Sequence, residues 1–161
     1  MAIDCFLKLE GIEGESSDHA HEGECEVLAW SWGASNSGTM HEARGGGAGK
    51  ANFQDISVTK WIDKASPALF QHVSTGKHIP KAWLTVRKAG GGEPVEYLVI
   101  ELEKVLVTSV STGGSGGEER LTENVSLNFG QFKLIYTPQE DDGTPGAEVE
   151  FGYNIAKHEV A

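Results

Sequence analysis

The sequence contains no long hydrophobic run. No stretch approaches the roughly 20 consecutive apolar residues that a membrane-spanning helix needs. The N-terminal segment MAIDCFLKLEG is interrupted by Asp4, Lys8 and Glu10, so it does not read as the apolar region of a secretory signal peptide. We therefore expect a protein that is made in the cytoplasm and that leaves it, if at all, through a dedicated machine without a cleaved signal peptide.

Cysteine, proline and basic residues are also scarce. The 161 residues include two cysteines, Cys5 and Cys25, and five prolines. Two cysteines in separate predicted strands of a cytoplasmic chain are more typical of buried thiols than of a disulfide, although the sequence leaves pairing open. With 13 basic and 24 acidic residues the net charge is −11, which argues against non-specific binding of nucleic acid.

Motifs of catalysis and of cofactor binding are missing. The run GGGAGK at residues 45–50 resembles a phosphate-binding loop, but Arg44 replaces a required glycine and Ala51 replaces the required Ser or Thr. His19 and His21 lie in an acidic segment without enough further ligands for a metal, and we expect both to be exposed. No Ser or Cys stands in a nucleophile motif. The sequence therefore predicts no enzyme, no cofactor and no metal site.

Glycine and alternating apolar residues, in contrast, are abundant. Residues 105–138 hold two apolar runs on either side of the glycine loop 113–117, which predicts a long β-hairpin. The buried set is expected to be Val125, Leu127 and Phe129 before Gly130, and its parity flips after that glycine. Because a one-residue slip turns every side chain to the wrong face, we expect a bulge at Gly130 or Gln131.

Further segments complete a mainly β fold. Alternation predicts strands at residues 3–10, 25–35, 56–62, 82–87 and 149–155, and the run at 95–102, which is apolar on both faces, predicts a central strand. One helix is predicted, capped by Ser66, with Pro67 in its first turn, Gly76 at its end, and an apolar stripe of Ala65, Leu69, Phe70 and Val73. The expected architecture is a single domain, residues 1–161, folded as a compact β-barrel of two packed antiparallel sheets with one flanking α-helix.

Two segments stand out for their chemistry. In the strand predicted at 25–35, Leu28, Trp30 and Trp32 share one face, while the opposite face carries small residues such as Ser31. Residues 37–52 have no period of either kind and are rich in glycine. A loop of this length inside a compact domain is often functional, and we expect a partner surface to order it.

Eight blocks of the sequence resemble the haemolysin-coregulated protein (Hcp) family of bacterial type VI secretion. They occur in order along the chain, and the strongest is the glycine loop with its flanks. The blocks are VLAWSWG (27–33), SG (37–38), GGGAGK (45–50), DKASP (63–67), GKH (76–78), LTVRKAGG (84–91), SVSTGGSGG (109–117) and LTENV (121–125).

The resemblance implies a homohexameric ring that stacks into a tube inside a contractile sheath and beneath a spike. Sheath contraction would expel the tube into the extracellular space or a target cell, and the lumen would bind small effector proteins. It also implies a ring-stacking loop, with Ser31 and Ser115 as candidate lumen contacts. The candidate stacking residues are His41, Arg44, Gly45, Gly46, Gly47, Gly49 and Lys50.

Partners are then other copies of the chain, the sheath and spike proteins, and the effectors, with no nucleic acid and no membrane insertion. Two other classes stay open: a sugar-binding β module that uses the four tryptophans, and a small β-barrel hydrolase. Like charges repel, so a chain of net charge −11 is expected to assemble better as salt screens it, unless the joining faces are complementary.

Overall fold

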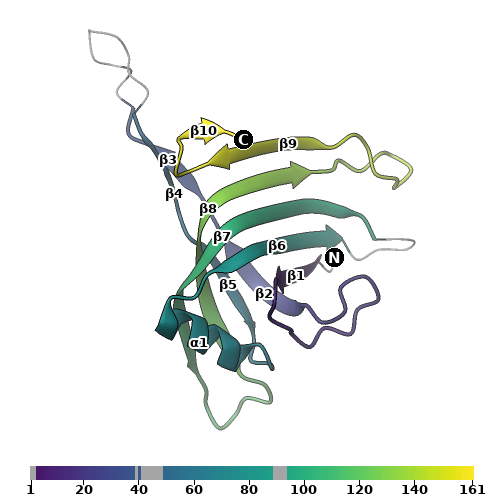
Figure 1. Cartoon of the computed structure of the whole chain (residues 1–161). Helices are drawn as coiled ribbons and strands as arrows, with labels where there is room; N and C mark the ends of the chain where they lie inside the picture. The colour runs from purple at the N-terminus through teal and green to yellow at the C-terminus, as the bar shows by residue number, and fades with distance from the viewer. Residues whose placement is uncertain (1–2, 39, 41–48, 89–93) are drawn as a thin grey trace.

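The computed structural model describes residues 3–38, 40, 49–88 and 94–161 (Figure 1). The helix, α1, spans Ser66–Thr75, and no helix in these ranges is long and apolar enough to cross a membrane. The strands in the same ranges are β1 (Ile3–Leu9), β2 (Cys25–Ser31), β3 (Ala34–Asn36), β4 (Ala51–Phe53), β5 (Ile56–Trp61), β6 (Ile79–Lys88), β7 (Glu96–Gly113), β8 (Thr122–Tyr136), β9 (Val149–Asn154) and β10 (Glu159–Val160).

The hairpin of β7 and β8 is the longest element of the fold. Its strands have 18 and 15 residues and pair antiparallel along most of their length. The hairpin predicted over 105–138 is therefore confirmed, and the segment predicted separately at 95–102 belongs to the same strand, β7. The first half of β8 also pairs with β5 and the second half with β9, so β8 joins two parts of the molecule.

The predicted change of parity occurs at Gly130, but the predicted one-strand bulge there is wrong. Phe129 and Phe132 are both buried, yet the register between β7 and β8 does not shift at this point. Lys104 on β7 faces the same place with a positive φ of 55°, and a Cβ on Gly130 would lie 3.3 Å from the Lys104 Cβ. Both strands thus bend together, and the missing Gly130 side chain leaves room for Lys104.

The register shift of the hairpin lies elsewhere, between Val107 and Ser109 of β7. A second shift lies between Val27 and Ala29 of β2. At that second shift Leu28 turns outward and is 49% exposed, so the prediction that Leu28 shares the face of the tryptophans is wrong. An extra residue in one strand inverts the side chains that follow it.

Six strands close into a barrel. The order β8-β5-β2-β1-β6-β7 is completed by the pairing of β7 with β8. β9 and β10 continue the sheet beyond β8, and β3 pairs with β4 in a small separate sheet that projects from the barrel (Figure 1). The predicted β-barrel with one flanking helix is confirmed.

The barrel interior holds one apolar core. Leu7, Leu84, Ile100 and Leu127 are each no more than 1% exposed, and side chains of this kind contribute about 1.5–3 kcal/mol apiece when fully buried. Alternation in the sequence predicted inward side chains for Leu7, Leu84 and Leu127, because successive side chains of a strand point to opposite faces. Ile100 lies in the run that was predicted to be apolar on both faces.

Helix α1 packs against β7 and ends as predicted. Gly76 adopts a left-handed φ of 72° and its N–H donates to the His72 carbonyl at 2.9 Å, which is the usual role of glycine at a helix C-terminus. The start differs from the prediction, because the cap position is Ala65 and Ser66 is buried inside the first turn. Phe70 was predicted in the apolar stripe and is instead 41% exposed.

Candidate functional site

The strand face around Ser31 is polar, small and uncharged. Its residues come from four neighbouring strands and lie opposite one another in two rows, set by the ladder registers, and we call them the polar wall. One row is Ser31, Ser57, Ser126 and Ser109, and the other is Ala29, Thr59, Asn124 and Ser111. The intervening residues of the same strands, such as Val58 and Val125, point into the core, so the polar wall is on the outside of the barrel.

Hydrogen bonds across the strands fix the polar wall. Thr59 Oγ1 donates to Asn124 Oδ1 at 2.7 Å, and Ser57 and Ser126 approach to 3.4 Å through their hydroxyl groups. At its margin, Asp55 accepts from Asn128 at 2.9 Å. The hydroxyl and amide groups of the polar wall carry no charge and can form hydrogen bonds with polar partners.

The two candidate lumen contacts are not brought together. Ser31 is exposed within the polar wall, whereas Ser115 is exposed in the loop that joins β7 to β8. Ser126, which belongs to the same row as Ser31, lies four residues from Thr122 at the start of β8, and each residue of a strand rises about 3.4 Å. Ser31, on β2, therefore lies level with the interior of β8, whereas Ser115 lies beyond the end of that strand.

The segment predicted as a long loop begins and ends in a two-stranded arm. We use the word arm for β3 and β4, in which Ala34 pairs with Phe53 and Asn36 pairs with Ala51. The prediction of one continuous strand over 25–35 is wrong, because β2 ends at Ser31 and the chain turns into the arm.

An aromatic cluster holds the base of the arm on the barrel. The rings of Trp32 and Phe132 are 4.9 Å apart, those of Phe53 and Phe132 are 5.0 Å apart, and those of Phe53 and Tyr153 are 5.1 Å apart. Trp32 Nε1 also donates to the Gln54 carbonyl at 3.0 Å. The tilted contacts are the favourable ones for aromatic pairs, so the base is packed within one chain and needs no partner to order it.

Of the predicted stacking residues, Gly49 and Lys50 lie in the described part of the chain. His41, Arg44, Gly45, Gly46 and Gly47 lie outside it. The Gly49 carbonyl accepts from Asn36 Nδ2 at 2.9 Å, and a Cβ on Gly49 would come within 2.6 Å of the Gly38 nitrogen. Glycine is therefore required where the two sides of the arm meet, and Lys50 beside it is exposed.

A buried charged cluster joins β5, α1 and β8, and sequence analysis missed it. Lys60 is fully buried, and its ammonium group donates to the Trp61 carbonyl at 2.9 Å, to Asp63 Oδ1 at 3.0 Å and to Glu123 Oε2 at 3.3 Å. Ser66 donates to the same Glu123 oxygen. The signal in the sequence was the parity of Lys60, which it shares with the buried Ile56 and Val58.

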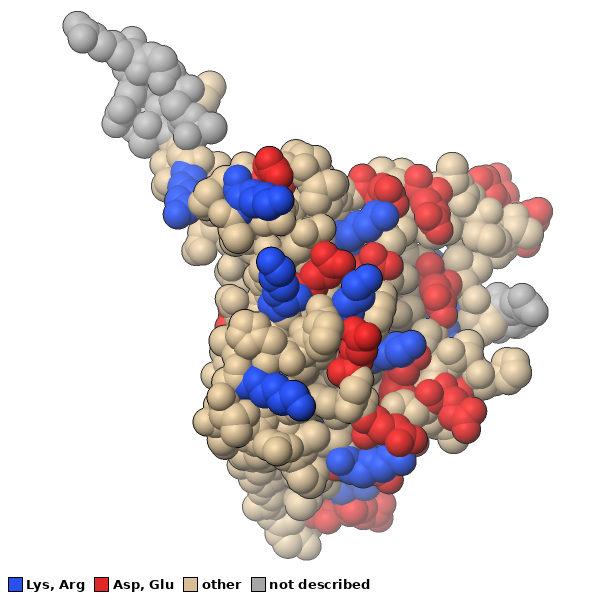
Figure 2. Space-filling view, in the orientation of Figure 1, with Lys and Arg blue, Asp and Glu red and all other residues tan. Residues whose placement is uncertain are grey.

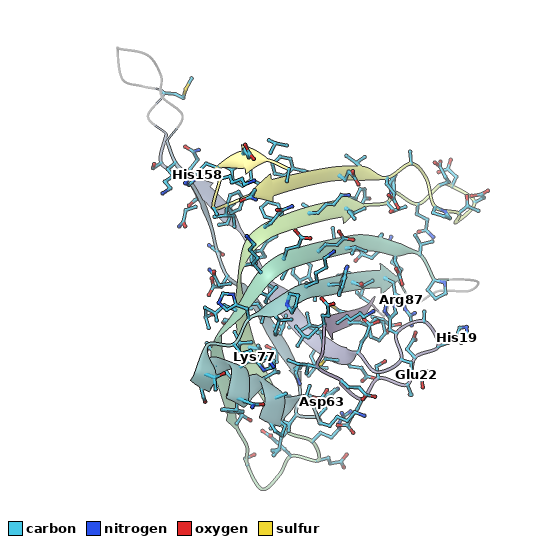
Figure 3. The ribbon with its side chains drawn as sticks, in the orientation of Figure 1. His19, Glu22, Asp63, Lys77, Arg87 and His158 are labelled. Atoms are coloured by element: carbon cyan, nitrogen blue, oxygen red, sulfur yellow. The ribbon has the colours of Figure 1, made fainter. Side chains whose placement is uncertain are left out.

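A second charged network ties the acidic segment 11–23 to the barrel. Arg87 of β6 forms hydrogen-bonded ion pairs with Asp18 and, at 3.3 Å, with Asp4. The Arg87 guanidinium holds the pKa of the Asp18 carboxyl below its ordinary value, chiefly through a hydrogen bond to the ionised form. Arg87 and Glu22 mark this region in Figure 3.

His21 belongs to the same network. Nδ1 lies 2.8 Å from Glu24 Oε2 and Nε2 lies 2.6 Å from Glu96 Oε1, while the ring stacks on Phe6 with centroids 4.4 Å apart. The prediction that His21 is exposed is wrong, because only 7% of it is accessible; His19 is exposed as predicted.

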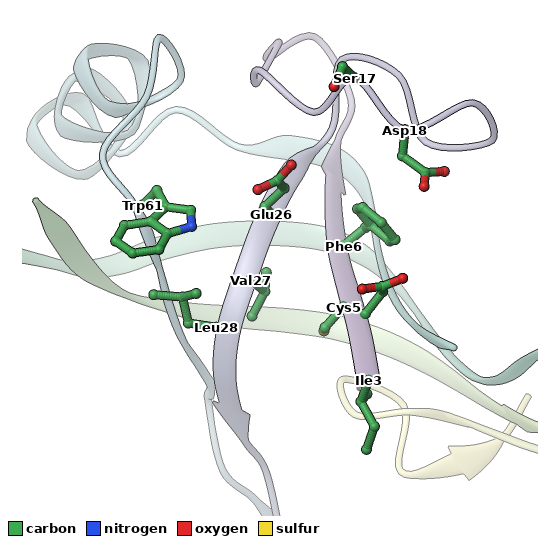
Figure 4. A pocket seen from close by; sticks show the side chains of 10 residues that line it. Ile3, Cys5, Phe6, Ser17, Asp18, Glu26, Val27, Leu28 and Trp61 are labelled. Carbon is green, nitrogen blue, oxygen red and sulfur yellow. The ribbon is translucent and has the colours of Figure 1, made fainter. Parts of the chain in front are cut away.

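Both cysteines are buried free thiols. Burial raises the pKa of each to about 12, and Asp63 adds to the effect at Cys25. Cys5 is one of the residues that line a groove of about 390 Å³ between β1, β2 and the acidic segment, together with Phe6 and Asp18 (Figure 4). Thiols of this kind are inert until the surrounding structure opens.

The four tryptophans, all in the described part of the chain, form no open platform for a sugar ring. Trp30 and Trp32 pack against the core. The Arg120 guanidinium lies 4.2 Å from the centre of the Trp61 ring, and Lys8 lies 5.2 Å from that of Trp83. In the same residue ranges, no three His, Cys, Asp or Glu side chains converge in a way that could hold a metal ion.

Comparison with known proteins shows which family this sequence resembles. A family model described as "Type VI secretion system effector, Hcp" matches residues 6–136. The chain is 58% identical over 159 residues to protein hcp1 of Pseudomonas aeruginosa, with 98% of each chain covered. The fold and the matches define a component of bacterial type VI secretion.

Superposition on solved structures supports the same family. A type six secretion system protein superimposes with a TM-score of 0.93 at 29% identity, covering 99% of this chain and 100% of the other. Hcp1 from Salmonella typhimurium superimposes with a TM-score of 0.81 at 36% identity, covering 100% of both chains. The chain belongs to the Hcp family.

Proposed function

We propose that the chain is the tube subunit of a type VI secretion system, a structural protein rather than an enzyme. Six copies form a ring, rings stack into a tube, and contraction of a surrounding sheath expels the tube beneath its spike. The protein is made in the cytoplasm and leaves the cell as part of the tube. Membership of the Hcp family supports this function.

The observation that carries the proposal is the polar wall. In a chain of net charge −11, eight residues on four adjacent strands form a face without a charged side chain. A face that lines a channel must let cargo of different charge bind and leave. Hydroxyl and amide groups suit that task because they form hydrogen bonds without attracting or repelling one sign of charge.

The arm supports the stacking part of the proposal. Its residues Ala34, Ser35 and Asn36 are all exposed, so beyond its aromatic base the arm buries little in a single chain. We propose that it reaches a subunit of the adjacent ring, with His41, Arg44, Gly45, Gly46, Gly47, Gly49 and Lys50 as the contacting residues.

The first test measures assembly. Size-exclusion chromatography with light scattering should give a hexamer, and deletion of residues 45–49 should leave hexamers while abolishing tubes in electron microscopy. A monomer in the wild-type protein would reject the ring. Tubes formed by the deletion variant would reject the role of the arm.

The second test concerns the lumen. Ser31→Gln and Ser115→Gln should each weaken co-purification of a small effector while rings persist, because the longer side chain occupies the space beside the wall. Ser74→Gln, on the exposed side of α1, is the matched control and should co-purify effector as the wild type does. Unchanged co-purification with Ser31→Gln would remove the polar wall from the binding surface.

A further inference from the structure

Among the described residues, exposed charged side chains that form no ion pair are distributed unevenly between two ends of the barrel. Figure 2 shows Asp and Glu gathered on the side away from the arm, with Lys and Arg interspersed among them, whereas the charged side chains visible at the base of the arm are mainly Lys or Arg. We call the first side the acidic end. Its loops carry five exposed carboxylates that form no ion pair within the described residues: Glu22, Glu140, Asp141, Asp142 and Glu148.

The side from which the arm projects is the basic end. Lys50, Lys104, Lys157 and His158 are exposed there, and within the described residues the three lysines form no ion pair. Lys104 faces Gly130, whose carbonyl accepts from the Ile155 N–H at 2.9 Å, which places Lys104 beside the β9–β10 turn. Figure 3 marks His158 at the base of the arm and Glu22 at the far side. Glu159 is a neighbouring acidic residue that lowers the net positive charge of this end without cancelling it.

The basic end is also hollowed. A groove of about 450 Å³ lies between the arm and the β9–β10 turn, lined by Asn36, Gly49, Lys50, Ala51, Tyr153 and His158. At the opposite end, residues 140–143 form a turn closed by a hydrogen bond from the Gly143 N–H to the Glu140 carbonyl at 2.9 Å. One end thus offers a concave surface with cations, and the other a protruding turn with three carboxylates.

We propose that the basic end of one subunit binds the acidic end of a second copy in the adjacent ring, with the groove receiving the 140–142 turn. The inference rests on the proposed tube function and identifies the two surfaces that join in the stack. Charges without partners in one chain find them in the next, and a head-to-tail contact of this kind repeats without closing. A ring would repeat it around its rim, so weak individual contacts would act together.

The direction in which salt changes ring–ring association distinguishes this proposal from simple repulsion between acidic chains. Screening weakens attraction between complementary faces just as it weakens repulsion between like ones. We expect ring–ring association, followed by sedimentation velocity, to weaken about tenfold between about 0.05 and 0.5 M NaCl, over which the screening length falls several-fold.

A charge swap between two rings is the decisive test. Lys157→Glu rings and Asp141→Lys rings should each self-associate about tenfold more weakly than the wild type, because each then presents like charges at the joint. Mixed together they should recover wild-type association, since alternating rings restore an opposite pair at both joints. Composition-gradient light scattering measures self- and cross-association in the same experiment.

Lys77→Glu and Glu118→Lys are controls that are matched in net charge and lie outside both ends. Each should self-associate as the wild type does, and their mixture should gain nothing. Equal behaviour of the swap pair and the control pair, or association that strengthens with salt, would overturn the proposal. So would loss of the hexamer itself in Lys157→Glu, which would assign the basic end to the ring. The proposed function fails separately, if the wild type forms no hexamer.

Discussion

The two charged networks of this protein consist of similar residues but differ in burial and in structural role. The cluster around Lys60 and Glu123 is fully buried, whereas Arg87 binds Asp18 and Asp4, of which 24% and 41% of the side chain is exposed. Burying a charge costs several kcal/mol unless it is paired and hydrogen bonded, while exposed pairs contribute about 1 kcal/mol or less. The first network therefore specifies how core elements meet, and the second holds a surface segment in place.

The protein carries a thiol beside each network. Cys25 lies near Asp63 of the buried cluster, and its pKa is raised to about 12 by burial and by that carboxylate. Cys5 shares its groove with Asp18 of the surface network. Since only the exposed thiolate reacts, the labelling rate of each cysteine reports the opening of its own region.

The largest effect is expected from Glu123→Ala. It leaves the Lys60 ammonium buried with Asp63 as its remaining acidic partner, and removing one member of a buried pair typically costs about 3–5 kcal/mol. Urea unfolding measures the loss, and labelling of Cys25 should accelerate more than that of Cys5. Glu118→Ala, in the exposed hairpin loop, is the control and should change neither quantity. A loss below about 1 kcal/mol would mean that the cluster is no more costly to break than a surface pair.

A smaller effect is expected from Arg87→Gln. The change removes the ion pairs to Asp18 and Asp4 and the guanidinium that lies 4.9 Å from the Phe6 ring centre. We expect a loss of about 1 kcal/mol, because the partners are partly exposed and water replaces the lost contacts. Here Cys5 should become the faster-labelled thiol. Lys88→Gln, the next residue along β6, should leave the order of the two thiols unchanged. Equal acceleration of Cys25 and Cys5 labelling in Arg87→Gln would contradict the proposed difference between the two networks.

The two networks also mark the limit of what the sequence could predict. Alternation along single strands predicted the barrel, the β7–β8 hairpin and the inward face of β6, and Gly76 predicted the helix end, since these follow from local backbone geometry. Ser66 was assigned to the helix cap because serine suits that position, but its partner Glu123 is 57 residues away. His21 is likewise buried by Glu96, 75 residues away.

The surfaces proposed for cargo binding were likewise predictable from the sequence only in part. Ser31 could be selected from its own strand, because the residues beside it on that face are small. The polar wall could not be predicted, since it depends on registers that place Ser57, Ser126 and Ser109 in one row. The shift at Leu28 is decided by the pairing of β2 with β5, and no residue in β2 signals it.

The smallest effect is expected from pH, and it acts on the surface network. Asp18 has a pKa below its ordinary value of 3.8 because Arg87 donates to its ionised form. A lowered pKa in the folded state contributes stability that is fully present above the ordinary value and is lost as the pH falls through the lowered one. The difference in unfolding free energy between the wild type and Asp18→Asn should therefore be constant from neutral pH to about pH 5 and shrink steadily below it. Urea unfolding of both proteins at each pH measures that difference, in which the titration of most other groups cancels. A difference that persisted unchanged into strong acid would mean that the charge of Asp18 does not hold the acidic segment on the barrel.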